Sequence, residues 1–61
     1  MIYLIFINGD NAGFSLVPYA SSDPAEVVYP IAESDLIALA GLDWENNLDR
    51  LHLQDEQLIF N

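Results

Sequence analysis

The chain opens with an uninterrupted apolar segment, Ile2–Ile7, that is rich in β-branched and aromatic residues. This pattern predicts a strand that is covered on both faces. The next segment, Asn8–Gly13, has the Asn and Gly residues that suit a reversal with positive φ angles. Phe14–Tyr19 then predicts a returning strand, and Pro18 places that strand at a sheet edge or ends it. The sequence therefore predicts a β-hairpin over residues 2–19.

The segment after this hairpin is open to two interpretations. Ala20–Pro24 has the composition of a linker, but Asp23, Pro24 and Glu26 also resemble a helix start. Pro30 leaves room for at most one helical turn. Val27–Tyr29 fits a strand fragment equally well.

The clearest helix pattern is Ser34–Gly41. Ser34, or Glu33 beside it, can cap the first turn, and Asp35 suits the positive end of the helix dipole. Gly41 is a natural C-terminal stop. Leu36, Leu39 and Ala40 recur at i, i+3 and i+4, so we expect them to face the sheet.

The C-terminal third also has two competing patterns. Leu51–Leu53 and Leu58–Phe60 lie on either side of the polar segment Gln54–Gln57, which predicts a second hairpin. Trp44, within the polar turn Asp43–Asn47, is spaced from Leu48 and Leu51 as on one helix face, which favours a helix instead.

Together these elements predict a single α+β domain over residues 1–61. We expect a small antiparallel sheet of three or four strands, with the N-terminal hairpin, C-terminal strands and one short helix packed on it. A helix of eight residues cannot cover a sheet whose first strand is apolar on both sides. Uncovered apolar area usually marks an interface, so we expect a homodimer or a tightly held partner.

Charge is the unusual feature of the composition. Hydrophobic residues make up 52% of the 61 residues, and ten acidic residues accompany a single basic one, Arg50, for a net charge of −9. Because charged residues are only 18% of the chain, the anomaly is the lack of Lys and Arg. Direct binding to nucleic acid or to an anionic membrane is therefore disfavoured. A basic partner is favoured, and the alternative is that the acidity only maintains solubility.

The residues do not suggest an enzyme. The only histidine, His52, lies between two leucines and is expected on the opposite, solvent-facing side of a strand. No serine lies in a nucleophile-elbow motif. Asn8–Gly13 is only faintly similar to a calcium loop, because Ala12 and Tyr19 stand where ligands are needed. We expect no cofactor and no metal.

The location expected from the sequence is the cytoplasm. No apolar segment approaches the roughly 18 residues of a membrane span, and Ile2–Ile7 lacks the basic leader of a signal peptide. The chain has no cysteine, which fits a reducing compartment.

The acids are spaced along the chain on expected turns, caps and outer faces, at Asp10, Asp23, Glu26, Glu33, Asp35, Asp43, Glu45, Asp49, Asp55 and Glu56. Duplex DNA carries a charge about every 1.7 Å along its axis. A rigid protein that copies part of this array can occupy a basic DNA-binding groove. This indicates an acidic DNA mimic that inhibits a nucleic-acid enzyme.

The segment Ser34–Gly41, followed by Leu51–Leu53 and an apolar end, resembles the small dimeric uracil-DNA glycosylase inhibitors of Bacillus phages. Asp10 and Gly13 also match the acidic, glycine-ended hairpin turn of that family. The likeness covers residues 2–19 and 34–60, with 22–30 as an insertion. The chain departs from the family at Pro18, Leu36 and Ala40, where the family has an acid, a functional aromatic residue and a tyrosine.

The resemblance implies a phage-encoded inhibitor that acts in the host cytoplasm. Such inhibitors hold, in an apolar pocket, the leucine that the glycosylase inserts into DNA, while carboxylates imitate the flanking phosphates. The residues that the resemblance assigns to the partner-binding site are Glu33, Ser34, Asp35, Leu36, Leu39, Ala40, Asp43 and Glu45. For the apolar members, the alternative is that they are only the core face of the helix.

Three functions therefore remain open. The first is inhibition of uracil-DNA glycosylase. The second is inhibition of a host defence nuclease, as by an anti-CRISPR protein. The third, from another class, is a homo-oligomeric interaction module without mimicry.

Overall fold

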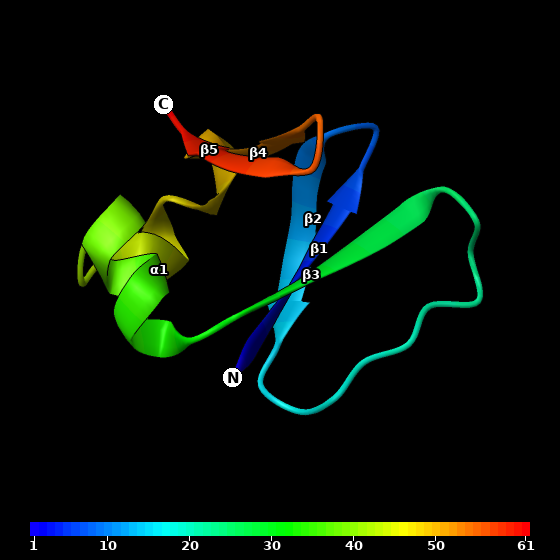
Figure 1. Cartoon of the computed structure of the whole chain (residues 1–61), viewed down its shortest axis with the longest axis horizontal. Coiled ribbons are helices and arrows are strands. Elements are labelled where there is room, and N and C mark those ends of the chain that lie inside the picture. Colours follow the sequence, from blue (N-terminus) through cyan, green and yellow to red (C-terminus); the bar gives the residue numbers. More distant parts are fainter.

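Five strands form one antiparallel sheet in the order β3-β1-β2-β4-β5 in the computed structural model, which describes residues 1–61 (Figure 1). The predicted α+β class is confirmed, with five strands where three or four were expected. The elements are β1 (Ile2–Ile7), β2 (Asp10–Ser15), β3 (Glu26–Ile31), α1 (Glu33–Ala40), the 3₁₀ turns η1 (Trp44–Asn46) and η2 (Leu48–Arg50), β4 (Leu51–Gln54) and β5 (Gln57–Phe60).

The N-terminal hairpin is confirmed, but its turn is shorter than predicted. Only Asn8 and Gly9 form the reversal, with φ angles of 53° and 85°. The rest of the expected turn belongs to β2, where the register shifts beside Ile5 and the Asn11 side chain bonds both backbone groups of Gly13 at 3.0 and 3.1 Å. An Asn side chain that satisfies its own backbone in this way stabilises a bulge.

β2 ends at Ser15, so the prediction of a return strand over Phe14–Tyr19 is wrong in its bounds. The Ser15 hydroxyl accepts a hydrogen bond from the Val17 amide at 3.2 Å and donates one to the Val17 carbonyl at 2.8 Å. This turn directs the chain away from the sheet before Pro18. β2 is also not an edge strand, because β1 and β4 pair with its two sides.

β3 supplies the strand that was not counted in the sequence prediction. It pairs with β1 along its whole length, from Ile2 opposite Ile31 to Ile7 opposite Glu26. The strand alternative for Val27–Tyr29 is thus confirmed, and a helix starting at Asp23 is not formed. Pro30 is compatible with this position because β3 is an edge strand, where a missing N–H is tolerated.

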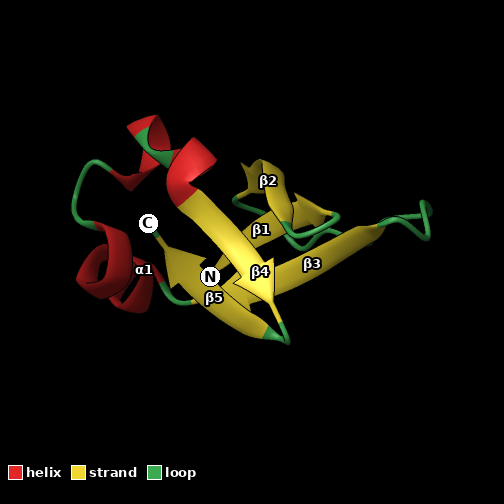
Figure 2. Cartoon of the chain, turned by 90° about the horizontal axis from the view of Figure 1, so that it is seen from above, coloured by secondary structure: helices red, strands yellow, loops and turns green.

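The two faces of β1 differ in burial. Ile2, Leu4 and Phe6 are buried on the concave face of the sheet, whereas Tyr3 and Ile5 on the other face remain half-buried. The prediction of a strand covered on both faces therefore holds fully for one face only. Figure 2 shows that α1 lies at one end of the curled sheet and does not cover the convex face.

Helix α1 begins one residue earlier than predicted and has no side-chain cap. The Ala32 carbonyl accepts hydrogen bonds from the amides of Asp35 at 3.1 Å and Leu36 at 3.0 Å. The prediction of Ser34 or Glu33 as the cap is therefore wrong. Gly41 ends the helix as expected, with φ 91° and its amide bonded to the Ile37 carbonyl at 2.8 Å.

The helix face that packs on the core consists of Leu36, Ile37 and Ala40. Leu39 is 41% exposed, so its predicted place on the sheet-facing side is wrong. At about 100° per residue, Leu39 lies roughly 110° from the centre of the Leu36–Ile37–Ala40 stripe. Ile37 therefore occupies the core-facing position that the i, i+3, i+4 spacing had predicted for Leu39.

Trp44 joins the helical end of the molecule to the sheet. It is buried, and its ring meets the Phe14 ring of β2 edge-on, with centroids 5.0 Å apart. The competing helical pattern through Leu48 and Leu51 is broken into η1 and η2, and Leu51 opens β4. The predicted C-terminal hairpin is confirmed, with Leu51 opposite Phe60 and Leu53 opposite Leu58.

The β4–β5 hairpin is attached to the rest of the sheet by a small contact. β2 and β4 share one residue pair, Asp10 opposite His52. Next to this pair, the Leu53 amide donates to the Gly9 carbonyl at 2.8 Å. The β1–β2 turn is therefore the place where the two hairpins meet.

Candidate protein-binding surface

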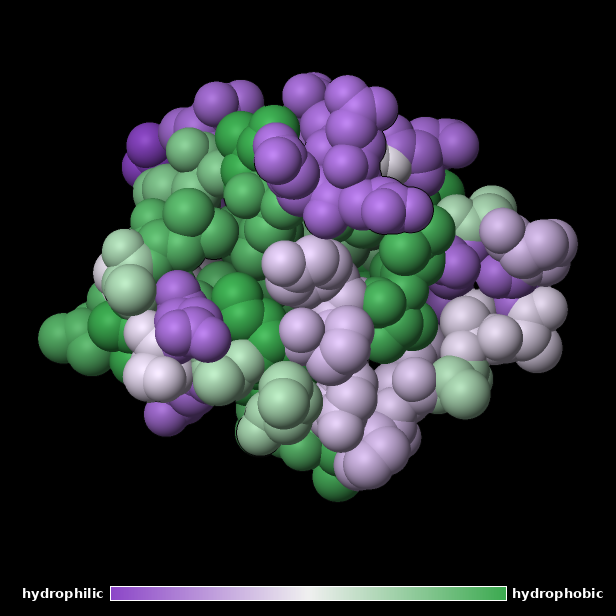
Figure 3. Space-filling view, viewed as in Figure 1, coloured by the Kyte–Doolittle hydropathy of each residue, from purple (hydrophilic) through white to green (hydrophobic).

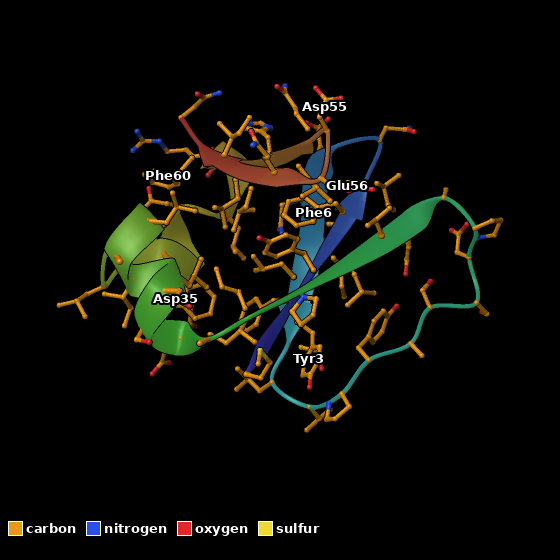
Figure 4. All side chains as sticks on the ribbon, viewed as in Figure 1. Tyr3, Phe6, Asp35, Asp55, Glu56 and Phe60 are labelled. Atoms are coloured by element: carbon orange, nitrogen blue, oxygen red, sulfur yellow. The ribbon has the colours of Figure 1, made fainter.

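All ten carboxylates lie on the surface, on three parts of the molecule. Nine belong to exposed residues, and Glu26 is half-buried. Figure 4 shows Asp35 on α1 and, far from it, Asp55 and Glu56 at the tip of the β4–β5 hairpin. The helical group is Glu33, Asp35, Asp43, Glu45 and Asp49; the hairpin group is Asp10, Asp55 and Glu56; the loop group is Asp23 and Glu26.

Almost none of this charge is compensated by a cation. His52 Nδ1 lies 3.2 Å from the Asp10 carboxylate, and this is the only acid–base pair in the protein. Arg50 donates its Nε–H to the Asn61 carbonyl, and its guanidinium lies 4.6 Å from the centre of the Phe60 ring. Nine of the ten carboxylates, all except Asp10, therefore have no cationic partner within the protein. A basic partner would find them free to pair.

The helical group contains every acidic residue assigned to the site by sequence. Glu33, Ser34 and Asp35 form the exposed first turn of α1. Asp43 and Glu45 lie around η1, which packs against α1. Asp43 is held in place because its carboxylate accepts a hydrogen bond of 2.6 Å from the side-chain NH₂ of Asn46. These residues share one end of the molecule.

The apolar residues assigned to the site do not form a pocket. Leu36 has no exposed surface, so in this structure it cannot contact a partner. Ala40 is half-buried against the core, and the surface has no pocket at any point. For Leu36 and Ala40 the structure thus fits the alternative that they belong to the core face of the helix.

Sequence reasoning missed the most exposed apolar residue beside the helical group. Leu42 is 85% exposed, and Leu39 on the preceding turn is 41% exposed. The exposure of Leu42 could have been expected from the sequence. Leu42 follows Gly41, which ends the helix, so it cannot lie on the core-facing side of that helix. These two leucines give the acidic end of the molecule an apolar contact area.

The loop group of acids lies beside the one ionisable side chain with a shifted pKa, Tyr19. The Tyr19 hydroxyl donates a hydrogen bond of 2.9 Å to the Glu26 carboxylate. This bond, and the nearby negative charge, raise the pKa of Tyr19 above its ordinary value of 10.0, because ionisation would remove the donor and place two anions together. The contact ties the loop between β2 and β3 to the start of β3.

Two members of the hairpin group, Asp55 and Glu56, form a turn whose backbone is unfavourable for residues with a Cβ. Asp55 and Glu56 have φ angles of 51° and 65°. A two-residue turn of this type favours Asn-Gly or Asp-Gly, because residues with a Cβ are disfavoured at positive φ. Figure 3 shows that hydrophilic residues gather over this hairpin at the top of the molecule.

Replacing Glu56 with Gly is therefore expected to stabilise the protein. Removing the Cβ at φ 65° should raise the free energy of unfolding by about 0.5–1 kcal/mol. Urea denaturation followed by circular dichroism measures this change. Glu56→Gln is the matched control, since it removes the same charge and keeps the Cβ. Equal stabilisation by both variants would show that the gain came from charge and not from the backbone.

The surface as a whole offers contact area and no enclosed site. No group of three or more His, Asp or Glu side chains lies close enough together to hold a metal ion. The single α-helix has eight residues, and no helix has the length and apolar character to cross a membrane. What the arrangement can do chemically is present unpaired carboxylates and apolar side chains to another molecule.

Searches of protein-family models, of curated proteins and of solved structures find no match to this chain.

Proposed function

We propose that this protein binds the basic surface of a DNA-binding enzyme and inhibits it as an acidic DNA mimic. The observation that carries the proposal is the set of nine carboxylates without a cationic partner on a surface that has no pocket. Unpaired surface carboxylates keep their full attraction for a cationic groove. A protein partner suits this surface better than a small molecule does, because small ligands need a concave site.

The contact is assigned to the helical group of acids. A groove that binds DNA reaches one side of a mimic, so carboxylates on three sides cannot act together. The helical group is the largest of the three, with five members, and Leu39 and Leu42 lie beside it. Charge accelerates association, and the exposed leucines supply the apolar contact that slows dissociation.

The specific target proposed is uracil-DNA glycosylase, in the cytoplasm of a phage-infected host. The support for this choice is the resemblance of Ser34–Gly41 and the C-terminal strand to the phage inhibitors. The fold supports the shared layout of a hairpin, a helix and later strands, and adds β3 to it. A host defence nuclease is the other target of the same class.

Uracil excision by a purified glycosylase, with this protein at near-stoichiometric dose, tests the target. Excision should be inhibited, and the inhibition should weaken at least about tenfold between low and high salt because exposed charges are screened. Added DNA should compete. If excision is undiminished, glycosylase is not the target, and the same assay with a defence nuclease follows.

Matched variants test the assigned surface. Glu33→Gln with Asp35→Asn changes the net charge from −9 to −7 at α1, and Asp23→Asn with Glu26→Gln makes the same change on the loop group. Both pairs preserve the shape of each side chain. We expect the α1 pair to lose affinity about tenfold or more and the loop pair to change little. Equal losses from both pairs would disprove the assignment to α1.

A second candidate is a self-associating module, and it is favoured by a different set of side chains. Leu16 and Val17, in the loop after β2, are 68% and 65% exposed. Exposed apolar surface of this kind also occurs at homo-oligomer contacts. Sedimentation at increasing salt separates the two functions. A module whose charges only repel should associate more strongly as salt rises, whereas mimicry predicts weaker binding to a basic enzyme.

A further inference from the structure

The outer edge of β5 has backbone groups without partners. In the β4–β5 hairpin, the two-residue turn makes Gln54 and Gln57 a hydrogen-bonded pair, and the Asn61 amide bonds the Arg50 carbonyl at 2.9 Å at the other end. Hydrogen-bonded pairs alternate in antiparallel sheets. The N–H and C=O groups of Leu58 and Phe60 therefore point away from β4, where no other strand lies.

The opposite orientation on β4 agrees with this geometry. Leu53 is paired with Leu58 across the hairpin, and its amide points outward to bond the Gly9 carbonyl at 2.8 Å. Because Leu58 is the partner of Leu53, its backbone N–H and C=O must also point outward, away from β4. The outward backbone groups of β4 thus join the hairpin to the sheet. The outward backbone N–H and C=O groups of β5 are spaced in the same way, and no strand is bonded to them.

The two edges of the sheet differ in their protection. β3 contains Pro30, which removes an N–H, and begins with the charged Glu26. β5 has the sequence Gln57–Phe60, with no proline, no charge and no bulge. Natural edge strands usually carry one of these devices to prevent pairing with another chain. Their absence from β5 marks it as the edge that can accept a strand.

The two ends of this edge differ in charge. Figures 1 and 2 both show β5 running from the hairpin tip toward α1, and Figure 4 places Glu56 at the first end and Phe60 beside α1 at the second. The tip carries Asp55 and Glu56, whereas Arg50 lies at the Phe60 end, with its guanidinium 4.6 Å from the centre of the Phe60 ring. Leu58 and Phe60 pack against the core on the inner face. An added strand would therefore meet carboxylates at the hairpin tip, Arg50 at the other end and apolar side chains on one face.

We infer that β5 binds an extended segment of the partner protein as a sixth strand, and that this segment alternates basic and apolar residues. A second copy of this chain is a poorer occupant, because pairing β5 with itself brings together two molecules of net charge −9. Main-chain bonds would provide affinity, and the alternation would provide specificity. The basic character of the segment rests on the proposed function, whereas the open edge does not depend on it.

The test uses chemically synthesised protein, which a chain of 61 residues permits. The probe is an eight-residue peptide of alternating Lys and Val. It should slow hydrogen exchange at Leu58 and Phe60, and a Glu–Val peptide of the same length should not. Protein with an N-methyl group on the Leu58 amide loses the outward donor and keeps every side chain. Its affinity for the Lys–Val peptide should fall about tenfold or more.

The possible outcomes separate this inference from the proposed function. Equal binding by the N-methylated and unmodified proteins, with melting temperatures unchanged, would overturn strand addition at β5. Protection of Leu58 that rises with protein concentration and needs no peptide would also overturn it, since the occupant would then be a second copy. Loss of glycosylase inhibition in the Glu33→Gln, Asp35→Asn protein tests only the proposed function.

Discussion

Replacing Trp44 with Ala is expected to remove a large part of the protein's stability. Trp44 is 3% exposed and meets Phe14 edge-on at 5.0 Å, so its removal leaves a cavity between η1 and the sheet. Truncating a buried aromatic side chain costs about 3–5 kcal/mol. A domain of 61 residues has a stability of about 3–9 kcal/mol at the usual value per residue. The loss is therefore comparable to the whole stability.

Urea denaturation followed by circular dichroism measures this effect, because the variant lacks the only tryptophan as a fluorescent reporter. Trp44→Phe is the matched control. It retains an aromatic ring against Phe14 and should cost less than about 2 kcal/mol. A Trp44→Ala protein with a native transition midpoint would show that η1 does not contribute to the core.

The elements with the strongest local signals could be predicted from the sequence. Asn8-Gly9 is a turn signal because both residues accept positive φ, and Gly41 stops α1 for the same reason. The alternation over Leu51–Leu53, followed by a polar turn and the apolar segment Leu58–Phe60, likewise predicted the second hairpin. In each case the chain needs only its nearest neighbours to select the conformation.

The features that the sequence did not predict depend on contacts between distant segments. β3 forms because β1 offers it a full partner, which overrides the interruption that Pro30 suggests. Ile37 replaces Leu39 on the core face because α1 packs on the core with its Leu36, Ile37 and Ala40 side, which leaves Leu39 41% exposed. A helical spacing fixes which residues share a face, but only the packed neighbours decide which face is inward.

The candidate site was predictable in its charge and not in its apolar part. Glu33, Asp35, Asp43 and Glu45 are exposed as expected, since acids without cationic partners remain in water. Leu36 was assigned to a binding pocket and is instead among the most buried residues. The apolar contact area shifts to Leu39 and Leu42, which lie outside the helical stripe. Burial of apolar residues is decided by the whole fold, so sequence alone could not separate core leucines from surface ones.

Replacing Gly9 with Ala is expected to weaken the joint between the two hairpins. Gly9 has φ +85°, and a Cβ at this position would lie 2.9 Å from the Leu53 carbonyl oxygen. The left-handed backbone costs an alanine about 1–2 kcal/mol. Relieving the close approach must move β4 away from the turn, which weakens the 2.8 Å bond from the Leu53 amide to the Gly9 carbonyl at a further cost of about 1 kcal/mol.

Gly41→Ala is the matched control for this prediction. Its φ is +91°, and a Cβ there would meet no atom within 4 Å, so it carries the backbone cost alone. Gly9→Ala should therefore lower the free energy of unfolding by about 2–3 kcal/mol. Gly41→Ala should lower it by about 1–3 kcal/mol, because φ 91° with ψ 172° is a conformation that residues with a Cβ rarely adopt. Hydrogen exchange should also accelerate at Leu53 in the Gly9 variant only. Equal losses in both variants, with Leu53 still protected, would mean that β4 does not depend on the β1–β2 turn for its place in the sheet.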